Sequence, residues 1–271
     1  MNKLVYLSIS LLVSFHTVQG QGDTLAEMRR FMTVCNSYKQ LPVQVNVVID
    51  RYASMATHTG DSSRMEAFFS LRPEGAYMRM EGVEQLVNDS LMLVVNTTTR
   101  RMVLYAHHQT VKGRLQDYLG MQLADSTVTF LAGKYRCFSF KGPGDTSVIE
   151  MRSRVLLAQT TFPREEVKLS FDAKTDQPFA VRQLKRSLVM VSKEVYHSVA
   201  GLPEWEGKAL STRDSLFFLV KEQVMVFHFQ QISHDPGGNL PVRVSDRIAA
   251  ELPGRYRPVT GYAGYVLNQQ F

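Results

Sequence analysis

Cysteine is scarce in this chain, and its scarcity excludes two classes of protein. Only 2 cysteines occur among 271 residues, too few for a disulfide-rich scaffold or for a zinc finger ligated by cysteine. Charged residues make up 21% and hydrophobic residues 44%, with 17 Gly and 10 Pro, which excludes disordered, collagen-like and coiled-coil chains. A chain of this length can bury a full core, as one large β domain or as two smaller ones.

Sequence motifs of catalysis are also missing. The chain contains no GxSxG, no HExxH, no phosphate-binding glycine loop and no paired cysteine motif. His107 and His108 are adjacent, so in a strand their rings point to opposite faces and do not easily share a metal ion. His228 and His234 have no carboxylate cluster with them. We therefore expect a protein that is not an enzyme and that needs neither a cofactor nor a metal ion.

A long apolar run is confined to the N-terminus. Lys3 precedes an apolar stretch that ends at Phe15, and Val18 and Gly20 place small residues where a signal peptidase cleaves. The stretch is too short for a membrane-spanning anchor, which needs about 20 apolar residues. We therefore predict a signal peptide over residues 1–20, a mature chain from about Gln21, and a location in the periplasm or outside the cell.

Positive charge is concentrated in one segment of the predicted mature chain. Cleavage removes one Lys and no acidic residue from a chain of formal net charge +6. Residues 152–193 hold nine Lys or Arg against four Asp or Glu. This segment either faces anionic lipid headgroups or an acidic partner, or is a basic hairpin in solvent. Export argues against a nucleic-acid partner. Cys35 and Cys137 allow a disulfide or two separate buried thiols.

An amphipathic helix opens the mature chain. Four of its apolar residues recur at helical spacing: Leu25, Met28, Met32 and Cys35. Thr24 and Glu27 fit a capping box, in which each side chain bonds the backbone N–H of the other residue. The helix should end near Tyr38, before Pro42. Its apolar face must pack on the β structure that follows.

Alternating apolar and polar residues then indicate a series of strands. In the first half these are residues 43–49, 65–71, 78–80, 83–87, 91–95 and 101–105. Asn88-Asp89-Ser90 is a turn cluster between two of them. The connections are too short for crossover helices, so the strands should form an antiparallel meander.

The second half continues in the same way. We expect a short helix near residues 115–123 and strands at residues 134–141, 148–161, 167–171 and 179–190. Residues 216–232 are apolar on both faces, so this segment should be covered on both sides or form a tight hairpin. The tail from Asp235 is rich in turns and tyrosine.

One stretch carries a family resemblance. The segment Phe68–Met80, FFSLRPEGAYMRM, is similar to the periplasmic lipoprotein carriers LolA and LolB. In that family an apolar strand runs into Arg-Pro and a further strand, and two apolar strands follow around a turn with Asp. Here Leu86–Asn96 stands in that place, although Val94 and Val95 replace the aromatic pair that usually follows the turn. The resemblance covers about Thr24–Tyr105, and the hairpin 167–190 loosely.

This resemblance implies an α+β fold. Its sheet would be antiparallel and strongly curved, an incomplete barrel whose concave face is covered by the N-terminal helix and a short lid helix. Arg72 matches the family arginine that holds the lid closed through hydrogen bonds. One such domain would span residues 21–271, with room for an added subdomain from about residue 200, as in the related regulators RseB and MucB.

Methionine supports an apolar cavity independently of the resemblance. Five of the 13 Met lie between residues 65 and 102, and the flexible Met side chain adapts to variable apolar guests. The alternative is ordinary core packing. We expect the following residues to line the cavity: Met28, Met32, Val45, Val47, Phe69, Met78, Met80 and Leu93.

These observations favour an exported envelope protein that binds a lipid or lipidated protein non-covalently, as a carrier does. Further contacts would be an envelope membrane protein and, through residues 152–193, the membrane surface. The alternative function is an envelope sensor, scaffold or secretion-associated interaction protein that has the same fold and a protein partner.

Overall fold

The computed structural model describes residues 23–37, 41–55, 61–106, 125–235, 237 and 240–270. In this part of the chain there are three α-helices, one sheet of 13 strands and one sheet of 2 strands. The predicted signal peptide over residues 1–20 and the predicted helix near residues 115–123 lie outside the described residues.

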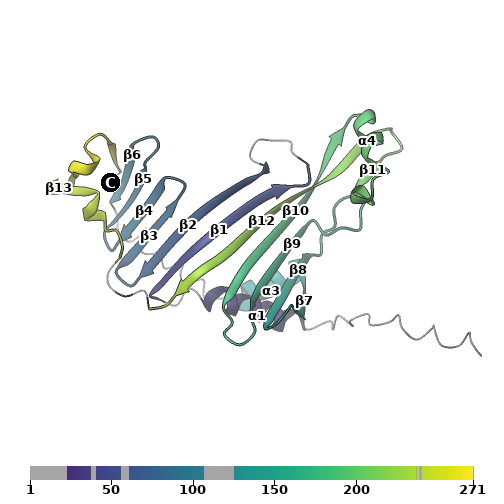
Figure 1. Cartoon of the computed structure of the whole chain (residues 1–271), viewed down its shortest axis with the longest axis horizontal. Coiled ribbons are helices and arrows are strands. Elements are labelled where there is room, and N and C mark those ends of the chain that lie inside the picture. The colour runs from purple at the N-terminus through teal and green to yellow at the C-terminus, as the bar shows by residue number, and fades with distance from the viewer. Residues whose placement is uncertain are drawn as a thin grey trace, which may run out of the picture.

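The first half of the large sheet is an antiparallel meander, as predicted. Each strand pairs with the next one along the chain, and Figure 1 shows them side by side. The six strands are β1 (Val43–Ala53), β2 (Ser63–Arg72), β3 (Gly75–Met80), β4 (Val83–Asn88), β5 (Leu91–Asn96) and β6 (Arg101–Ala106).

A second meander follows helix α3 (Asp125–Lys134). Its strands are β7 (Tyr135–Lys141), β8 (Thr146–Ser153), β9 (Glu165–Asp172) and β10 (Pro178–Val191). Helix α4 (Lys193–Val199), a 3₁₀ turn (Pro203–Trp205) and the short strand β11 (Ala209–Ser211) lead to β12 (Phe217–Ser233).

Strand β12 joins the two meanders. It pairs with β1 on one side and with β10 on the other, antiparallel in both cases. The alternative of a tight hairpin for residues 216–232 is therefore wrong. The segment is apolar on both faces because it lies in the middle of the sheet, where Leu219 and Val220, on opposite faces, are both fully buried.

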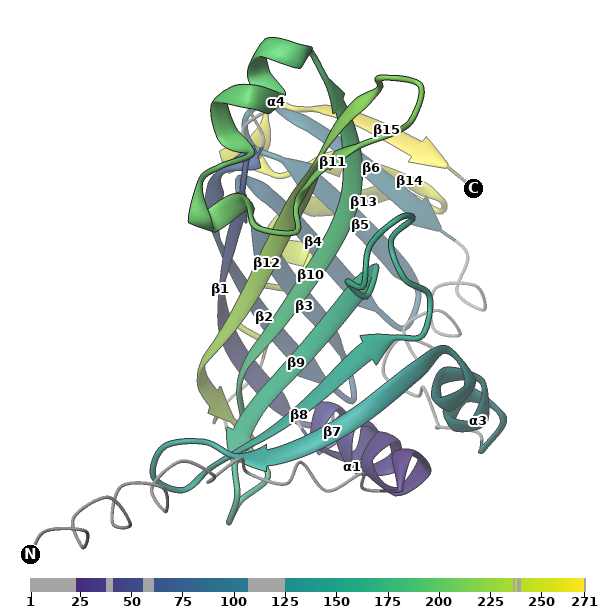
Figure 2. The ribbon, with the colours of Figure 1, turned by 90° about the vertical axis from the view of Figure 1, so that its right-hand side faces the viewer.

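The sheet curves strongly and does not close, as the α+β prediction required. Helix α1 (Thr24–Ser37) and α3 lie within the curve at the β7–β9 end (Figure 2). The helix α1 was predicted correctly, but its cap was not. Asp23 is the N-cap, because its carboxylate accepts the backbone N–H of Leu25, whereas Glu27 accepts a hydrogen bond from the Ser139 hydroxyl.

The C-terminal residues form a layer of their own. A 3₁₀ turn (Val244–Asp246) leads to the two-stranded sheet of β13 (Ile248–Leu252) and β14 (Arg255–Pro258). A further 3₁₀ turn (Thr260–Tyr262) precedes β15 (Val266–Gln270), which pairs parallel with β6 at the edge of the large sheet. We call residues 240–270 the C-terminal segment.

The structure corrects one predicted strand and decides between the alternatives for the two cysteines. The predicted strand over residues 148–161 is too long, because β8 ends at Ser153 and the chain then folds back on itself, with the Arg164 N–H bonded to the Val155 carbonyl. Cys35 and Cys137 are not joined by a disulfide, which decides between the two alternatives; Cys137 is buried and Cys35 is partly buried. Burial, together with the nearby charge of Glu27, raises the pKa of Cys137 to about 11.

Candidate functional site on the concave face

The register of the strands divides the side chains between two faces of the sheet. Val45 pairs with Phe69, and Phe69 pairs with Met78, so these three share one face. On the same face, Ile49 is connected through successive strand pairs to Leu169, which packs against α1 and α3. This face is the inside of the curve (Figure 2), and we call it the concave face. The opposite side is the outer face.

An apolar surface covers the concave face where β1, β2 and β12 adjoin. Four of its members are buried and six are partly exposed: Val45, Val47, Ile49 and Ala67, then Met65, Phe69, Met225, Phe227, Phe229 and Ile232. We call these ten residues the apolar surface. Met78 continues it on β3 beside Phe69, and Met80, 44% exposed, continues it beside Ala67. The structure thus brings together five of the residues predicted to line the cavity.

Met28 and Met32 lie elsewhere on the concave face. Both are on α1 and contact the core between the helices and β7–β9. Met28 is 0% exposed and packs in one cluster with Phe31, Val34 and Val128. In the described residues these two methionines are core packing, which was the alternative interpretation of the methionines.

Leu93 is on the wrong face for the predicted cavity. It pairs with Leu86, which pairs with Tyr77, and these residues form the outer face. There Leu93 is 0% exposed beneath the C-terminal segment. The prediction failed because residues 91–95 are apolar at every position, so their alternation does not indicate which side chains face inward. Its neighbour Val94 lies on the concave face instead, in register with Gln85 and Met78.

Arg72 is at the end of β2 and is only 7% exposed. Its Nη2 donates a hydrogen bond to the carbonyl oxygen of Gly237, at 3.1 Å, in the connection between β12 and the C-terminal segment. By alternation Arg72 belongs with Ser70 to the outer face. The lid helix that the resemblance implied falls outside the described residues, so a lid-closing role of Arg72 stays a prediction.

The apolar surface ends in a polar pocket. Beyond Ile49 and Phe227, the next concave residues of β1, β12 and β10 are mostly polar or charged, and they surround a cavity of about 390 Å³. Its concave side chains include Arg51, Asp61, Gln183, Lys185, Gln223 and Met225. We call this cavity the polar pocket. The pocket was not predicted from the sequence, although Arg51 continues the alternation of Val45, Val47 and Ile49 and was the available signal.

A buried ion pair forms one border of the polar pocket. Lys221 Nζ is 2.6 Å from Asp61 Oδ2, and both side chains are almost fully buried. Asp61 lines the pocket, and its negative charge is compensated by Lys221. The pocket therefore keeps the positive charges of Arg51 and Lys185.

The outer face of β3–β6 is covered by the C-terminal segment. Arg247 Nε donates to Glu84 Oε2 at 3.0 Å, and its guanidinium lies over the ring of Tyr262, 4.8 Å from the centroid. Burial, and then the charge of Glu84, raises the pKa of the Tyr77 phenol beside this pair. The arrangement fastens the C-terminal segment to the sheet.

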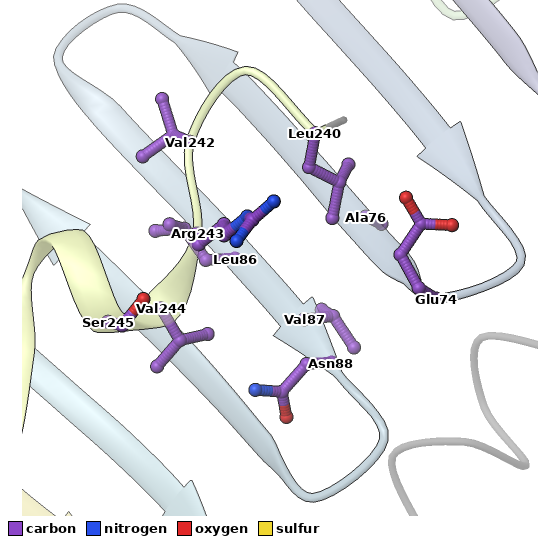
Figure 3. A pocket seen from close by; sticks show the side chains of 10 residues that line it. All are labelled: Glu74, Ala76, Leu86, Val87, Asn88, Leu240, Val242, Arg243, Val244 and Ser245. Atoms are coloured by element: carbon purple, nitrogen blue, oxygen red, sulfur yellow. The ribbon is translucent and has the colours of Figure 1, made fainter. Parts of the chain in front are cut away.

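A second cavity lies where the C-terminal segment crosses β3 and β4. Figure 3 shows Leu240 and Val244 beside Leu86 and Val87 at its wall. Its volume is about 230 Å³, below the range of roughly 300–1,000 Å³ that small-molecule sites occupy. We regard it as a gap in the packing of the two layers and assign it no ligand.

The outer face of β9, β10 and β12 carries a charge cluster. Arg186 donates to Glu166 at 2.6 Å and to Glu222 at 2.9 Å, and Lys208 donates to Glu222 at 2.8 Å. Burial alone would raise the pKa of Glu222, but the hydrogen bonds from Lys208 and Arg186 outweigh it and hold this pKa below its ordinary value. The cluster compensates part of the charge of residues 152–193, whose contact with a membrane stays a prediction.

The described residues contain neither a metal-ligand group nor a helix that could span a membrane. No three side chains of His, Cys, Asp or Glu come together there as a metal site would need. His228 Nε2 lies 3.3 Å from Asp50 Oδ2 on the outer face. None of the helices in this part of the chain has the length and apolar character to cross a membrane.

Comparison with known proteins gives a likeness of fold only. No family model and no curated protein matches the chain. Among solved structures, it is similar to a LolA superfamily protein from Nitrosomonas europaea, at 12% identity and a TM-score of 0.26, covering 80% of this chain and 94% of the other. An outer membrane lipoprotein-sorting protein domain from Vibrio parahaemolyticus has 10% identity and a TM-score of 0.27, covering 78% and 93%. A DUF1329 family protein from Desulfovibrio piger has 8% identity and a TM-score of 0.27, covering 80% and 95%.

Proposed function

We propose that this chain is an exported envelope protein that binds the acyl chain of a lipid or lipidated protein non-covalently. The observation that carries this proposal is the apolar surface on the concave face. Phe69, Phe227 and Phe229 are only partly buried there, in a sheet that curves around them without closing. Apolar side chains gathered on a concave surface are typical of sites for apolar ligands.

The chemistry of such a site needs no catalytic group. Each acyl methylene that leaves water contributes about 0.8 kcal/mol, so one chain can bind through burial alone. Met65, Met78, Met80 and Met225 surround the phenylalanines, and methionine adapts its shape to chains of different length. This combination supports a carrier-like role better than it supports an enzyme.

Export is the second part of the proposal. We place the mature N-terminus at or near Gln21, after cleavage behind Gly20, and the mature protein in the periplasm. N-terminal sequencing of the protein from an envelope fraction should begin near Gln21. An intact N-terminus that still contains Lys3 would contradict export by this route.

The binding proposal is tested on protein purified from its own envelope without detergent. We expect organic extraction followed by mass spectrometry to release acyl chains in roughly stoichiometric amount. Delipidated protein should then take up a fluorescent fatty acid with saturation. Absence of both co-purified chains and saturable uptake would overturn the proposal.

A second candidate function has one specific observation in its favour. Helix α4 has no buried residue, and several apolar side chains around it are exposed: Met190, Val195, Leu202 and Leu216. Figure 1 shows α4 and β11 at the far end of β10 and β12. An apolar patch of this kind fits a sensor or scaffold that docks a protein partner. Protein without acyl chains and without probe uptake would favour this alternative.

A further inference from the structure

We propose that the polar pocket binds the anionic headgroup of the same amphiphile whose acyl chain lies on the apolar surface. This inference rests on the proposed function and adds the class of ligand. The site would select lipids that end in a carboxylate or phosphate over neutral lipids with the same chain.

The order of residues along the strands matches the shape of an amphiphile. Across β1, β12 and β10, one concave row is Ile49, Phe227 and Val181. The next row is Arg51, Met225 and Gln183, and the one after it is Ala53, Gln223 and Lys185. Rows on one face are separated by two residues, about 7 Å. The surface therefore changes from apolar to charged within the length of a few methylene groups, as an amphiphile does.

The charge of the polar pocket also favours an anion. Among the residues that the structure describes, neither Arg51 nor Lys185 has a carboxylate within salt-bridge distance. The carboxylates of Asp61 and Glu165 lie near these cations, and both already have partners. Asp61 pairs with Lys221 at 2.6 Å. Glu165, which faces Lys185 in the register, accepts from the Tyr135 hydroxyl at 2.9 Å and lies 3.9 Å from Lys134.

The pocket is therefore left with two positive charges and no free negative one among these groups. An Arg guanidinium offers donors in a fork that matches a carboxylate or a phosphate. Gln183 in one row and Gln223 in the next add amide donors to the wall of the pocket. Two cations and two amides around one cavity are suited to an anion and unsuited to a cationic or purely apolar end group.

The volume of the polar pocket and its continuity with the apolar surface fit a headgroup attached to an acyl chain. The polar pocket has a volume of about 390 Å³, within the range of roughly 300–1,000 Å³ of small-molecule sites. Met225 belongs both to the apolar surface and to the wall of the polar pocket, so the two share a boundary. This continuity favours a headgroup attached to a chain over a free anion.

The test compares two ligands of equal chain length, hexadecanoate and its neutral methyl ester, in displacing a fluorescent acyl probe at pH 8. Wild type should bind hexadecanoate at least about tenfold more tightly than the ester, the equivalent of about 1.4 kcal/mol. The double variant Arg51→Gln/Lys185→Gln should lose this preference and keep its affinity for the ester. Acetate, the headgroup without a chain, should not compete.

A matched control removes two charges outside the concave face. Lys193→Gln/Arg213→Gln changes the net charge by the same amount at the exposed end near α4 and should keep the preference. Circular dichroism checks that both double variants are folded. The preference of wild type should also shrink at high salt, because exposed charges are screened.

The possible outcomes distinguish the headgroup site from the acyl site. Equal binding of both ligands by wild type, or a preference that survives in the Arg51/Lys185 variant, would overturn the headgroup site and leave acyl binding intact. Competition by acetate equal to that of hexadecanoate would overturn the lipid as the source of the anion. Failure of wild type to bind either ligand would overturn the acyl site and the headgroup site together.

Discussion

Phe69 occupies the middle of the apolar surface, between Val45 on β1 and Met78 on β3. A glutamate at this position would place an unpaired carboxylate among apolar side chains, which is unfavourable both for folding and for an acyl guest. We expect Phe69→Glu to lower the affinity for a fluorescent fatty acid more than about tenfold, since a buried aromatic ring contributes about 1.5–3 kcal/mol. Fluorescence titration gives the affinity.

The control for this prediction is Met190→Glu. Met190 is 67% exposed and lies at the far end of β10, so the same change there should leave uptake as in wild type. Folding of both variants is checked by circular dichroism. Unchanged uptake by folded Phe69→Glu would remove the apolar surface as the binding site.

Substitutions of Arg72 distinguish two possible roles of its side chain, holding the connection at Gly237 and closing a lid. Its hydrogen bond to the Gly237 carbonyl is of the charge-assisted kind, which contributes about 1.5–3 kcal/mol. We expect Arg72→Leu to speed proteolytic cleavage near residue 237, and Arg72→Lys to do so less, because a point charge replaces a fork of donors. Timed proteolysis with mass spectrometry measures this. Altered uptake and transfer of ligand at an unchanged cleavage rate would instead support the lid-closing role.

The sequence predicts which face of the sheet a side chain occupies better where polar residues interrupt the apolar ones. Val45, Val47 and Phe69 were expected to share one face, and they do, because Gln44, Asn46 and Ser70 mark the other face. Leu93 was misplaced because nothing polar marks its strand. Arg51 and Lys185 were missed for another reason: they come together only because β12 lies between β1 and β10, which are 125 positions apart or more in the chain.

Among the elements, the C-terminal segment is held on the sheet by a buried ion pair in addition to its apolar packing and the β15–β6 pairing. Glu84 is 9% exposed, and Arg247 is its hydrogen-bond partner. Arg247→Met leaves that carboxylate buried and uncompensated, and we expect the free energy of unfolding to fall by about 3 kcal/mol. The double variant Arg247→Met/Glu84→Gln should recover part of the loss. Urea denaturation measures both.

The exposed pair Arg255–Glu251 supplies the control. Both of its side chains are largely in solvent, so Arg255→Met should cost less than about 1 kcal/mol. Equal losses for Arg247→Met and Arg255→Met would mean that the C-terminal segment is not fastened through Glu84.

Element prediction succeeded for short strands joined by tight turns. The first meander and α1 follow from alternation, helical spacing and turn residues, all of which are local signals. The parallel pairing of β15 with β6 and the central place of β12 are non-local, and local periodicity carries no information about them. The C-terminal layer over the outer face was missed for the same reason.

For the molecule as a whole, the charge cluster on the outer face makes stability depend on pH. The folded pKa of Glu222 is held below the ordinary value of 4.5, so its stabilising effect is present above pH 4.5 and is lost as the pH falls through the folded pKa. We expect the free energy of unfolding of wild type to decline below about pH 4.5 more steeply than that of Glu222→Gln. Urea denaturation between pH 3 and 7 measures the difference.

The control is Asp145→Asn, which removes a carboxylate from the exposed pair with Lys174. It should retain the acid dependence of wild type in this window. Parallel curves for wild type and Glu222→Gln would show that the cluster does not contribute to acid sensitivity.

The central position of β12 also delays completion of the large sheet until late in the chain. Strand β1 is complete at residue 53, but its second partner, β12, begins at residue 217, roughly 160 positions later. Until then β1 and β10 each present an unpaired edge, and a long free edge is a template for pairing with other chains. Contacts of such large sequence separation also form slowly. Refolding yield should therefore fall steeply with protein concentration, as light scattering would show, and during synthesis these edges stay unpaired until the last fifth of the chain arrives.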